Sequence, residues 1–168
     1  MTNVLIMGDS QSVEPGKKAE KILLEHGYNV RRLSSVGMGP YDHVRMPVLW
    51  NRYISCVRTF KPDLIVLIFG TNDAPTHNLD TSLEKLKSSV KPPVILTGPP
   101  QYPSSERQAI GLDVKRRYQS AFGEDYLDSY PHTSTDLVRD RLGLHFTSVS
   151  ASAWGEAIAK EVLRRTAT

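Results

Sequence analysis

The 168-residue sequence has only one cysteine, Cys56, so no disulfide can form within the chain. It lacks any apolar run approaching the roughly 20 residues that a membrane-spanning helix requires. Its first residues also lack the basic stretch and apolar segment of an export signal. We therefore expect no membrane span. The missing export signal suits a cytoplasmic protein, a trimmed chain, or a phage-encoded protein that is released by lysis. The apolar neighbours of Cys56 predict a buried thiol on a helix.

A large excess of charge of one sign is missing too, because 21 Lys and Arg residues against 18 Asp and Glu residues leave a net charge of +3. The basic residues form short, scattered groups at 31–32, 115–117 and 164–165, without interleaved aromatic residues or a helix-turn-helix pattern. We therefore expect no nucleic-acid partner. The histidines and carboxylates do not have the spacing of metal ligands, so we expect neither a metal nor another cofactor.

Apolar runs alternate with segments of helical periodicity along the whole chain. The runs predict strands over 3–7, 28–33, 63–69 and 94–98, with a short edge strand over 126–128. The periodic segments predict helices over 15–26, 42–60, 79–90, 107–122 and 151–165. The continuous apolar run over 64–69 is typical of a parallel strand that is buried on both faces. We therefore predict a single α/β domain over 1–168, with a doubly wound parallel sheet of about five strands and helices on both faces.

The first predicted strand runs directly into Gly8-Asp9-Ser10. Functional groups of an open α/β sheet lie at the carboxyl ends of its strands, and a hydroxyl at a strand-to-helix turn sits beside free backbone N–H groups. Ser10 is therefore our candidate nucleophile. The alternative is that Asp9 and Ser10 only cap the following helix, which is the commoner role of such a pair.

Two further loops at the same edge of the sheet carry groups that could stabilise an oxyanion. Hydrolysis of an ester needs a nucleophile, a base and donors aimed at the oxygen that becomes negative. Gly37 could present its backbone N–H and Asn72 its side-chain amide. Gly39 lies two residues further on and could take the place of Gly37. Turn chemistry alone would also explain the glycines, and an Asx turn would explain Asn72.

The base should be a histidine, and the chain has five. His145 is the best placed, because a loop just before the last helix can reach back over the same edge of the sheet. His26 falls at a predicted helix end, where it would interact with the last carbonyl groups. The remaining three, His43, His77 and His132, are surface or substrate-side candidates.

Together these motifs resemble the SGNH hydrolases, also called GDSL esterases and lipases. The resemblance rests on Gly8-Asp9-Ser10, a glycine after the second strand, Gly70-Thr71-Asn72-Asp73 after the third strand, and a late histidine before the last helix. It spans nearly the whole chain and implies a flavodoxin-like three-layer α/β/α sandwich. The roles that it implies are nucleophile for Ser10, oxyanion hole for the N–H groups of Ser10 and Gly37 and the Asn72 amide, and general base for His145.

One position departs from the family pattern. The family usually has an aspartate three residues before the histidine, where its carboxylate fixes the imidazole tautomer, and here that position is Leu142. The nearest carboxylates are Asp140, five residues before His145, and Asp136. A loop rearrangement could bring Asp140 into the role, or a backbone carbonyl could orient the ring in a Ser-His dyad. The third alternative is a relative that has lost its activity.

Neighbouring polar residues are expected to support the site. Asp9 and Asp73 should hold their loops together by accepting hydrogen bonds from nearby amides. Gln11 could donate to a substrate or be solvated at the start of the helix. These expectations place three polar side chains around Ser10 and Asn72 without giving them a chemical step.

A chain of this length has little room for a lid or a deep acyl tunnel, which favours small acyl groups. Trp50, Tyr41 and Tyr102 could stack on a sugar, so the leading expectation is a serine esterase that removes small acyl groups, above all acetyl, from a small-molecule or carbohydrate ester. The alternatives are a short-chain lipase or thioesterase, and a non-catalytic glycan-binding module that has kept the fold.

Overall fold

The computed structural model describes residues 1–73 and 77–167, apart from the side chain of His77. Its strands are β1 (Asn3–Gly8), β2 (Asn29–Ser34), β3 (Leu64–Ile68), β4 (Val94–Thr97) and β5 (Tyr126–Leu127). Its α-helices are α1 (Val13–Glu25), α2 (Pro40–Arg45), α3 (Pro47–Phe60), α4 (His77–Ser88), α5 (Ser105–Phe122) and α6 (Ser152–Thr166). Its 3-10 helices are η1 (Ser10–Ser12), η2 (Gly123–Asp125) and η3 (Tyr130–His132).

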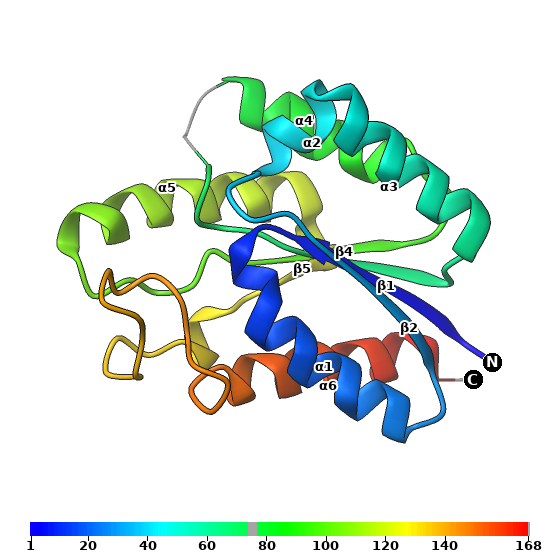
Figure 1. Ribbon diagram of the computed structural model, residues 1–168. Helices are drawn as coiled ribbons and strands as arrows, with labels where there is room; N and C mark the ends of the chain where they lie inside the picture. The colour runs from blue at the N-terminus through cyan, green and yellow to red at the C-terminus, as the bar shows by residue number, and fades with distance from the viewer. Residues whose placement is uncertain (74–76, 168) are drawn as a thin grey trace.

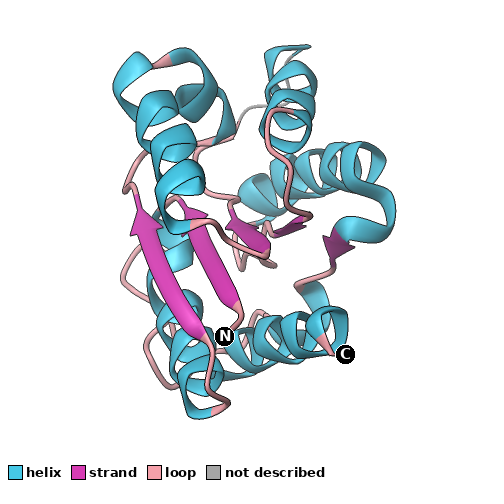
Figure 2. Ribbon diagram, turned by 90° about the vertical axis from the view of Figure 1, so that its right-hand side faces the viewer, coloured by secondary structure: helices cyan, strands magenta, loops and turns pink. Residues whose placement is uncertain are grey.

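The strands form one parallel sheet in the order β2-β1-β3-β4-β5. Figure 2 shows them side by side between two layers of helices. The predicted doubly wound sheet and three-layer sandwich are therefore confirmed. The direction of winding changes between β1 and β3, and the carboxyl ends of strands at such a switch point border a crevice. Ser10 follows β1, at this switch point.

Helices α1 and α6 cover one face of the sheet, and α2, α3, α4 and α5 lie on the other (Figure 1). Successive residues of β1 point to opposite faces, as strand geometry requires. Leu5 and Met7 pack with the α3–α5 layer, and Val4 and Ile6 pack with the α1–α6 layer. Both faces of the strand are therefore buried, which is why its sequence is continuously apolar rather than alternating.

The predicted helix over 42–60 is divided in two. Helix α2 ends at Arg45 and α3 begins at Pro47, while Met46 between them is extended at ψ 117°. The ring of a proline crowds the preceding residue and disfavours its helical conformation, so Pro47 ends one helix and starts the next. Cys56 is buried on α3, as predicted.

None of the helices over residues 1–73 and 77–167 combines the length and apolar character needed to cross a membrane.

Candidate active site

The turn after β1 presents Ser10 at the carboxyl edge of the sheet. Asp9 caps η1, because its side chain accepts a hydrogen bond of 2.8 Å from the backbone N–H of Gln11. Gly8 permits a close approach of β1 to β3, since a Cβ at this position would lie 1.9 Å from the carbonyl oxygen of Ile68. Ser10 is thus half-buried and directly follows the buried strand β1.

A chain of hydrogen bonds joins Ser10 to a histidine and an aspartate. The Oγ of Ser10 lies 2.8 Å from Nε2 of His145, and Nδ1 of His145 lies 2.6 Å from Oδ2 of Asp140. A carboxylate at Nδ1 selects the tautomer with the proton on that nitrogen, which leaves Nε2 free to accept the proton of Ser10. Of the sequence alternatives, the geometry therefore favours Asp140 as the partner of the histidine.

A tight turn explains how an aspartate five residues before the histidine can reach it. The N–H of Gly143 donates to the carbonyl of Asp140 at 3.0 Å, and the N–H of Asp140 donates to the carbonyl of His145 at 2.9 Å. Gly143 has a left-handed φ of 68°, which suits a glycine after a turn. Leu142 is 75% exposed at the tip of the turn. The two ends of the turn thus place Asp140 beside His145.

The carboxylate of Asp140 is held in its ionised form. A hydrogen bond of 2.9 Å from the backbone N–H of Leu144 to Oδ1 and the contact with His145 lower the pKa of Asp140 to about 2. The same backbone donor fixes the direction of the carboxylate, so Oδ2 faces the imidazole. Asp140 therefore remains a negatively charged acceptor at any pH well above 2.

Gln11 holds the histidine loop against the nucleophile turn. Its side chain is buried, and Nε2 donates a hydrogen bond of 2.7 Å to the carbonyl of Leu144, next to His145 in the sequence. The expectation that Gln11 is solvated is therefore wrong, whereas donation to a substrate stays a prediction, because Gln11 lines the cavity beside Ser10 and its amide has a second hydrogen. A buried side-chain amide finds a partner within the protein, and here that partner is the backbone of the opposite loop.

Arg139 stabilises the other side of the loop that carries Asp140 and His145. Its guanidinium carbon lies 4.2 Å from the centre of the Phe146 ring, and these two residues also form an isolated antiparallel bridge. Nη2 of Arg139 donates to the carbonyl groups of Thr133 and Ser134, each at 3.2 Å. The residues that flank Asp140 and His145 are therefore held by contacts outside the turn.

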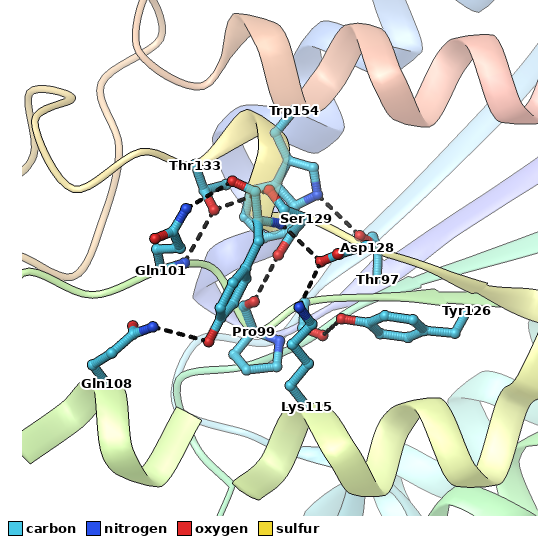
Figure 3. Close-up of polar contacts among 12 residues, drawn as sticks. Thr97, Pro99, Gln101, Gln108, Lys115, Tyr126, Asp128, Ser129, Thr133 and Trp154 are labelled. Atoms are coloured by element: carbon cyan, nitrogen blue, oxygen red, sulfur yellow. Dashed lines mark hydrogen bonds and ion pairs between the residues drawn. The ribbon is translucent and has the colours of Figure 1, made fainter. Parts of the chain in front are cut away.

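Thr133 in turn belongs to a polar network over the end of β4 (Figure 3). Its hydroxyl donates to the carbonyl of Ser129 at 3.0 Å and accepts from the N–H of Gln101 at 3.0 Å. The hydroxyl of Ser129 donates to the carbonyl of Pro99 at 2.6 Å. Both hydroxyl-bearing residues are fully buried, so this network ties the segment before the histidine loop to the sheet.

Asp9 joins the loops after β1 and β3, as predicted from the sequence. Its Oδ2 accepts from the N–H groups of Gly70 at 3.2 Å and Thr71 at 3.0 Å, and from the Asn72 amide at 3.4 Å. Burial raises the pKa of Asp9, and these donors oppose that effect. Asp73 accepts a hydrogen bond from the hydroxyl of Tyr118, and its predicted contacts with the backbone amides of its own loop stay a prediction, because that loop continues into residues outside the described ranges.

Replacing Asp9 with asparagine is expected to destabilise the protein by about 1–3 kcal/mol. Both carboxylate oxygens of Asp9 accept hydrogen bonds, whereas an asparagine has one accepting oxygen and would turn its amide toward backbone donors. Chemical denaturation followed by circular dichroism measures the change. Asp113→Asn, on the surface of α5, is the control, and equal stability of the two variants would contradict the assigned role of Asp9.

Between the two candidate glycines, the contacts favour Gly37 as an oxyanion donor. The N–H of Gly39 caps α2 by donating to Oδ2 of Asp42 at 2.9 Å. The N–H groups of Gly37 and Ser10 have no hydrogen-bond partner within residues 1–73 and 77–167. Asn72 is exposed and has a second amide hydrogen beyond the one that faces Asp9.

Three other histidines have described side chains, and none of the three joins the hydrogen-bonded chain. His26 interacts with a carbonyl group at the end of its helix, as predicted, because its Nδ1 lies 2.8 Å from the carbonyl oxygen of Ile22. The surface or substrate-side prediction for His43 is wrong, because His43 is fully buried against Phe69 and burial lowers its pKa to about 4. His132 is half-buried in η3, and the side chain of His77 lies outside the described part of the chain.

Of the three aromatic residues proposed to stack on a sugar, Tyr102 is excluded. It is 3% exposed, and its hydroxyl donates to the carbonyl of Gly70. Trp50 packs edge-on against Tyr53. Tyr41 is 41% exposed and is the most accessible of the three.

A cavity of about 310 Å³ opens beside Ser10 and His145. The residues that line it are Ser10, Gln11, Val13, Glu14, Pro15, Val36, His145 and Phe146. Within the described ranges, no group of three or more His, Cys, Asp or Glu side chains could hold a metal ion.

No family model matches the chain, and no curated protein matches it by sequence. Solved structures do match it over nearly its whole length. A protein from Slackia heliotrinireducens whose description assigns it to the SGNH hydrolases has a TM-score of 0.75 at 11% identity, covering 96% of this chain and 98% of its own. The fold is that of the SGNH hydrolases.

Two further matches with this fold are named as esterases. A carbohydrate acetylesterase from Sinorhizobium meliloti has a TM-score of 0.71 at 16% identity, over 98% of this chain and 100% of its own. An aryl esterase from M. smegmatis has a TM-score of 0.68 at 17% identity, over 98% and 99%. At these identities the similarity concerns the fold, and it confirms the architecture that the resemblance to SGNH hydrolases implies.

Proposed function

We propose that this protein is an SGNH-type serine esterase that hydrolyses small acyl esters, above all acetyl esters, on a carbohydrate. The observation that carries the proposal is the continuous hydrogen-bonded chain from Ser10 through His145 to Asp140, with contacts of 2.8 and 2.6 Å. A capped serine without chemical function would not need a histidine and a carboxylate in this order.

The proposed reaction begins when Nε2 of His145 accepts the proton of Ser10 and Oγ attacks the ester carbonyl carbon. The carbonyl oxygen becomes negative and is stabilised by the N–H groups of Ser10 and Gly37 and by the Asn72 amide. The imidazolium then gives its proton to the departing alcohol oxygen, leaving an acyl group on Ser10. A water molecule attacks this acyl group with the same histidine as base, which releases the acid and restores the serine.

Asp140 contributes by charge and orientation rather than by accepting the proton. Its carboxylate is ionised and lies against Nδ1 of His145, so it stabilises the imidazolium formed in each half of the reaction. The low pKa of Asp140 is consistent with this role, because an acid that remains ionised cannot take the proton from the ring at neutral pH.

An alcohol of the size of one sugar ring fits the cavity beside Ser10 and His145. The cavity of about 310 Å³ lies at the low end of the ~300–1,000 Å³ of ligand pockets, which suits one ring better than a long chain. Structures of this fold named as a carbohydrate acetylesterase and an aryl esterase support the same choice. The leucine at position 142 favoured a non-catalytic glycan-binding module. It no longer supports that alternative, because Asp140 contacts the histidine instead.

Comparison of p-nitrophenyl acetate with the octanoate ester tests the acyl preference. We expect kcat/KM to be at least tenfold higher for acetate, and we expect His145→Ala to abolish both activities. A preference for octanoate would replace the proposal with a lipase. Absence of turnover with both esters, in a folded protein, would contradict an esterase and favour the glycan-binding module.

A further inference from the structure

The cavity beside Ser10 contains one acidic side chain with no established role in the proposed reaction. Glu14 lies in the first turn of α1 and lines the cavity together with the apolar residues Val13, Pro15, Val36 and Phe146. No lysine or arginine is among the eight lining residues. Glu14 is therefore the one carboxylate of this lining, and no lysine or arginine of the lining offsets its charge.

The position of the cavity relative to the reacting atoms indicates which half of an ester it receives. Its lining includes Ser10 and His145 but neither Gly37 nor Asn72. During hydrolysis the carbonyl oxygen faces the oxyanion donors, whereas the departing oxygen faces the histidine that protonates it. The cavity therefore accommodates the alcohol half of the ester.

The local contacts leave the Glu14 carboxylate available to a ligand. Lys17 is its ion-pair partner at 3.5 Å, but the Lys17 side chain is 54% exposed and the Glu14 side chain 29% exposed. Such surface pairs are weak and readily exchange partners. The N-terminus of α1 would by itself attract an anion, but its partial positive charge is about half the full negative charge of Glu14.

We propose that Glu14 determines the charge of the alcohol that this enzyme accepts. Its carboxylate accepts hydrogen bonds from a hydroxyl-rich neutral alcohol such as an uncharged sugar, favours a cationic alcohol such as an amino sugar, and repels anionic alcohols such as sugar phosphates or uronates. This inference rests on the proposed esterase function and adds the substrate class to it.

Three acetate esters of para-substituted phenols test the proposal: anionic 4-acetoxybenzoate, neutral 4-acetoxybenzamide and cationic 4-(trimethylammonio)phenyl acetate. The variant is Glu14→Gln, which keeps the size of the side chain and removes its charge. For each ester, kcat/KM of the variant is divided by that of the wild type. This ratio cancels the intrinsic reactivity of each ester, and comparing ratios between esters cancels any difference in the folded fraction.

We expect Glu14→Gln to raise kcat/KM for the anionic ester about five- to tenfold relative to the neutral ester, and to lower it by a similar factor for the cationic ester. The change should lie mainly in KM and shrink with added salt. Glu25→Gln is the control, because it makes the same charge change on α1 eleven residues away, about 16 Å along the helix. It should leave the three ratios equal.

Equal ratios for the three esters in Glu14→Gln would overturn the inference while the esterase function stands. Absence of hydrolysis of all three esters by the folded wild-type protein would instead overturn the esterase function, and the inference with it.

Discussion

Replacing Ser10 with alanine is expected to lower kcat for p-nitrophenyl acetate by roughly 10⁴- to 10⁶-fold. Alanine removes the Oγ that lies 2.8 Å from Nε2 of His145, so Ser10 can no longer carry an acyl group. Initial rates of p-nitrophenol release measure the loss.

The protein should remain folded, because Ser10 is half-buried and its side chain makes no other hydrogen bond within the described ranges. Ser120→Ala, an exposed serine on α5, is the matched control and should keep full activity. A Ser10→Ala protein that is folded and retains more than a few per cent of the wild-type rate would exclude Ser10 as the nucleophile.

Asp140→Asn should lower kcat by about 10²- to 10⁴-fold with little change in stability. The asparagine would keep its oxygen on the Leu144 N–H and turn its amide toward Nδ1 of His145. That arrangement requires an unprotonated Nδ1 and places the proton on Nε2, which then cannot accept the proton of Ser10. Asp140 is exposed, so a water molecule can partly replace its carboxylate as the acceptor at Nδ1, which limits the loss.

The pH dependence gives a second readout for the same residue. The pKa of Asp140 is lowered from its ordinary value of 3.8 to about 2. Its carboxylate therefore stays ionised as the pH falls and becomes protonated only near pH 2. We therefore expect no part of a decline in wild-type activity between pH 7 and pH 4 to come from protonation of Asp140.

Asp136→Asn is the matched control for Asp140→Asn. Asp136 is an exposed aspartate of the same segment that pairs with Ser134, and within the described ranges it has no hydrogen bond to His145. It should retain wild-type activity. If Asp140→Asn lost less than about fivefold, the account of the acid would be wrong and a Ser-His dyad would replace it.

The sheet could be predicted from the sequence because strands buried on both faces are continuously apolar. The run over 64–69 predicts β3, the central strand, and the order of strands and helices predicts the winding. The division of the helix over 42–60 was also present in the sequence, as the proline after Met46, but helical periodicity on both sides concealed it. Such periodicity shows that residues share a face and does not show that their backbone is continuous.

Part of the candidate site could be predicted from the sequence and part could not. Ser10, Asn72 and His145 are marked by short motifs at strand ends or before the last helix, so their approach follows from the topology. The pairing of Asp140 with His145 depends on a turn closed by Gly143, and spacing alone left it open. No local sequence pattern signals the contact of Gln11 with the backbone of Leu144, because the two residues lie 133 positions apart.

The measurement that tests the central claim most directly is covalent capture of the nucleophile. The folded protein is treated with a small fluorophosphonate, and the adduct is counted by intact-protein mass spectrometry and located by peptide mapping. The account predicts one adduct per chain, on Ser10, formed by the wild type and by Ser120→Ala and absent from Ser10→Ala and His145→Ala. An adduct on another residue, or no adduct on a folded protein that hydrolyses p-nitrophenyl acetate, would contradict it.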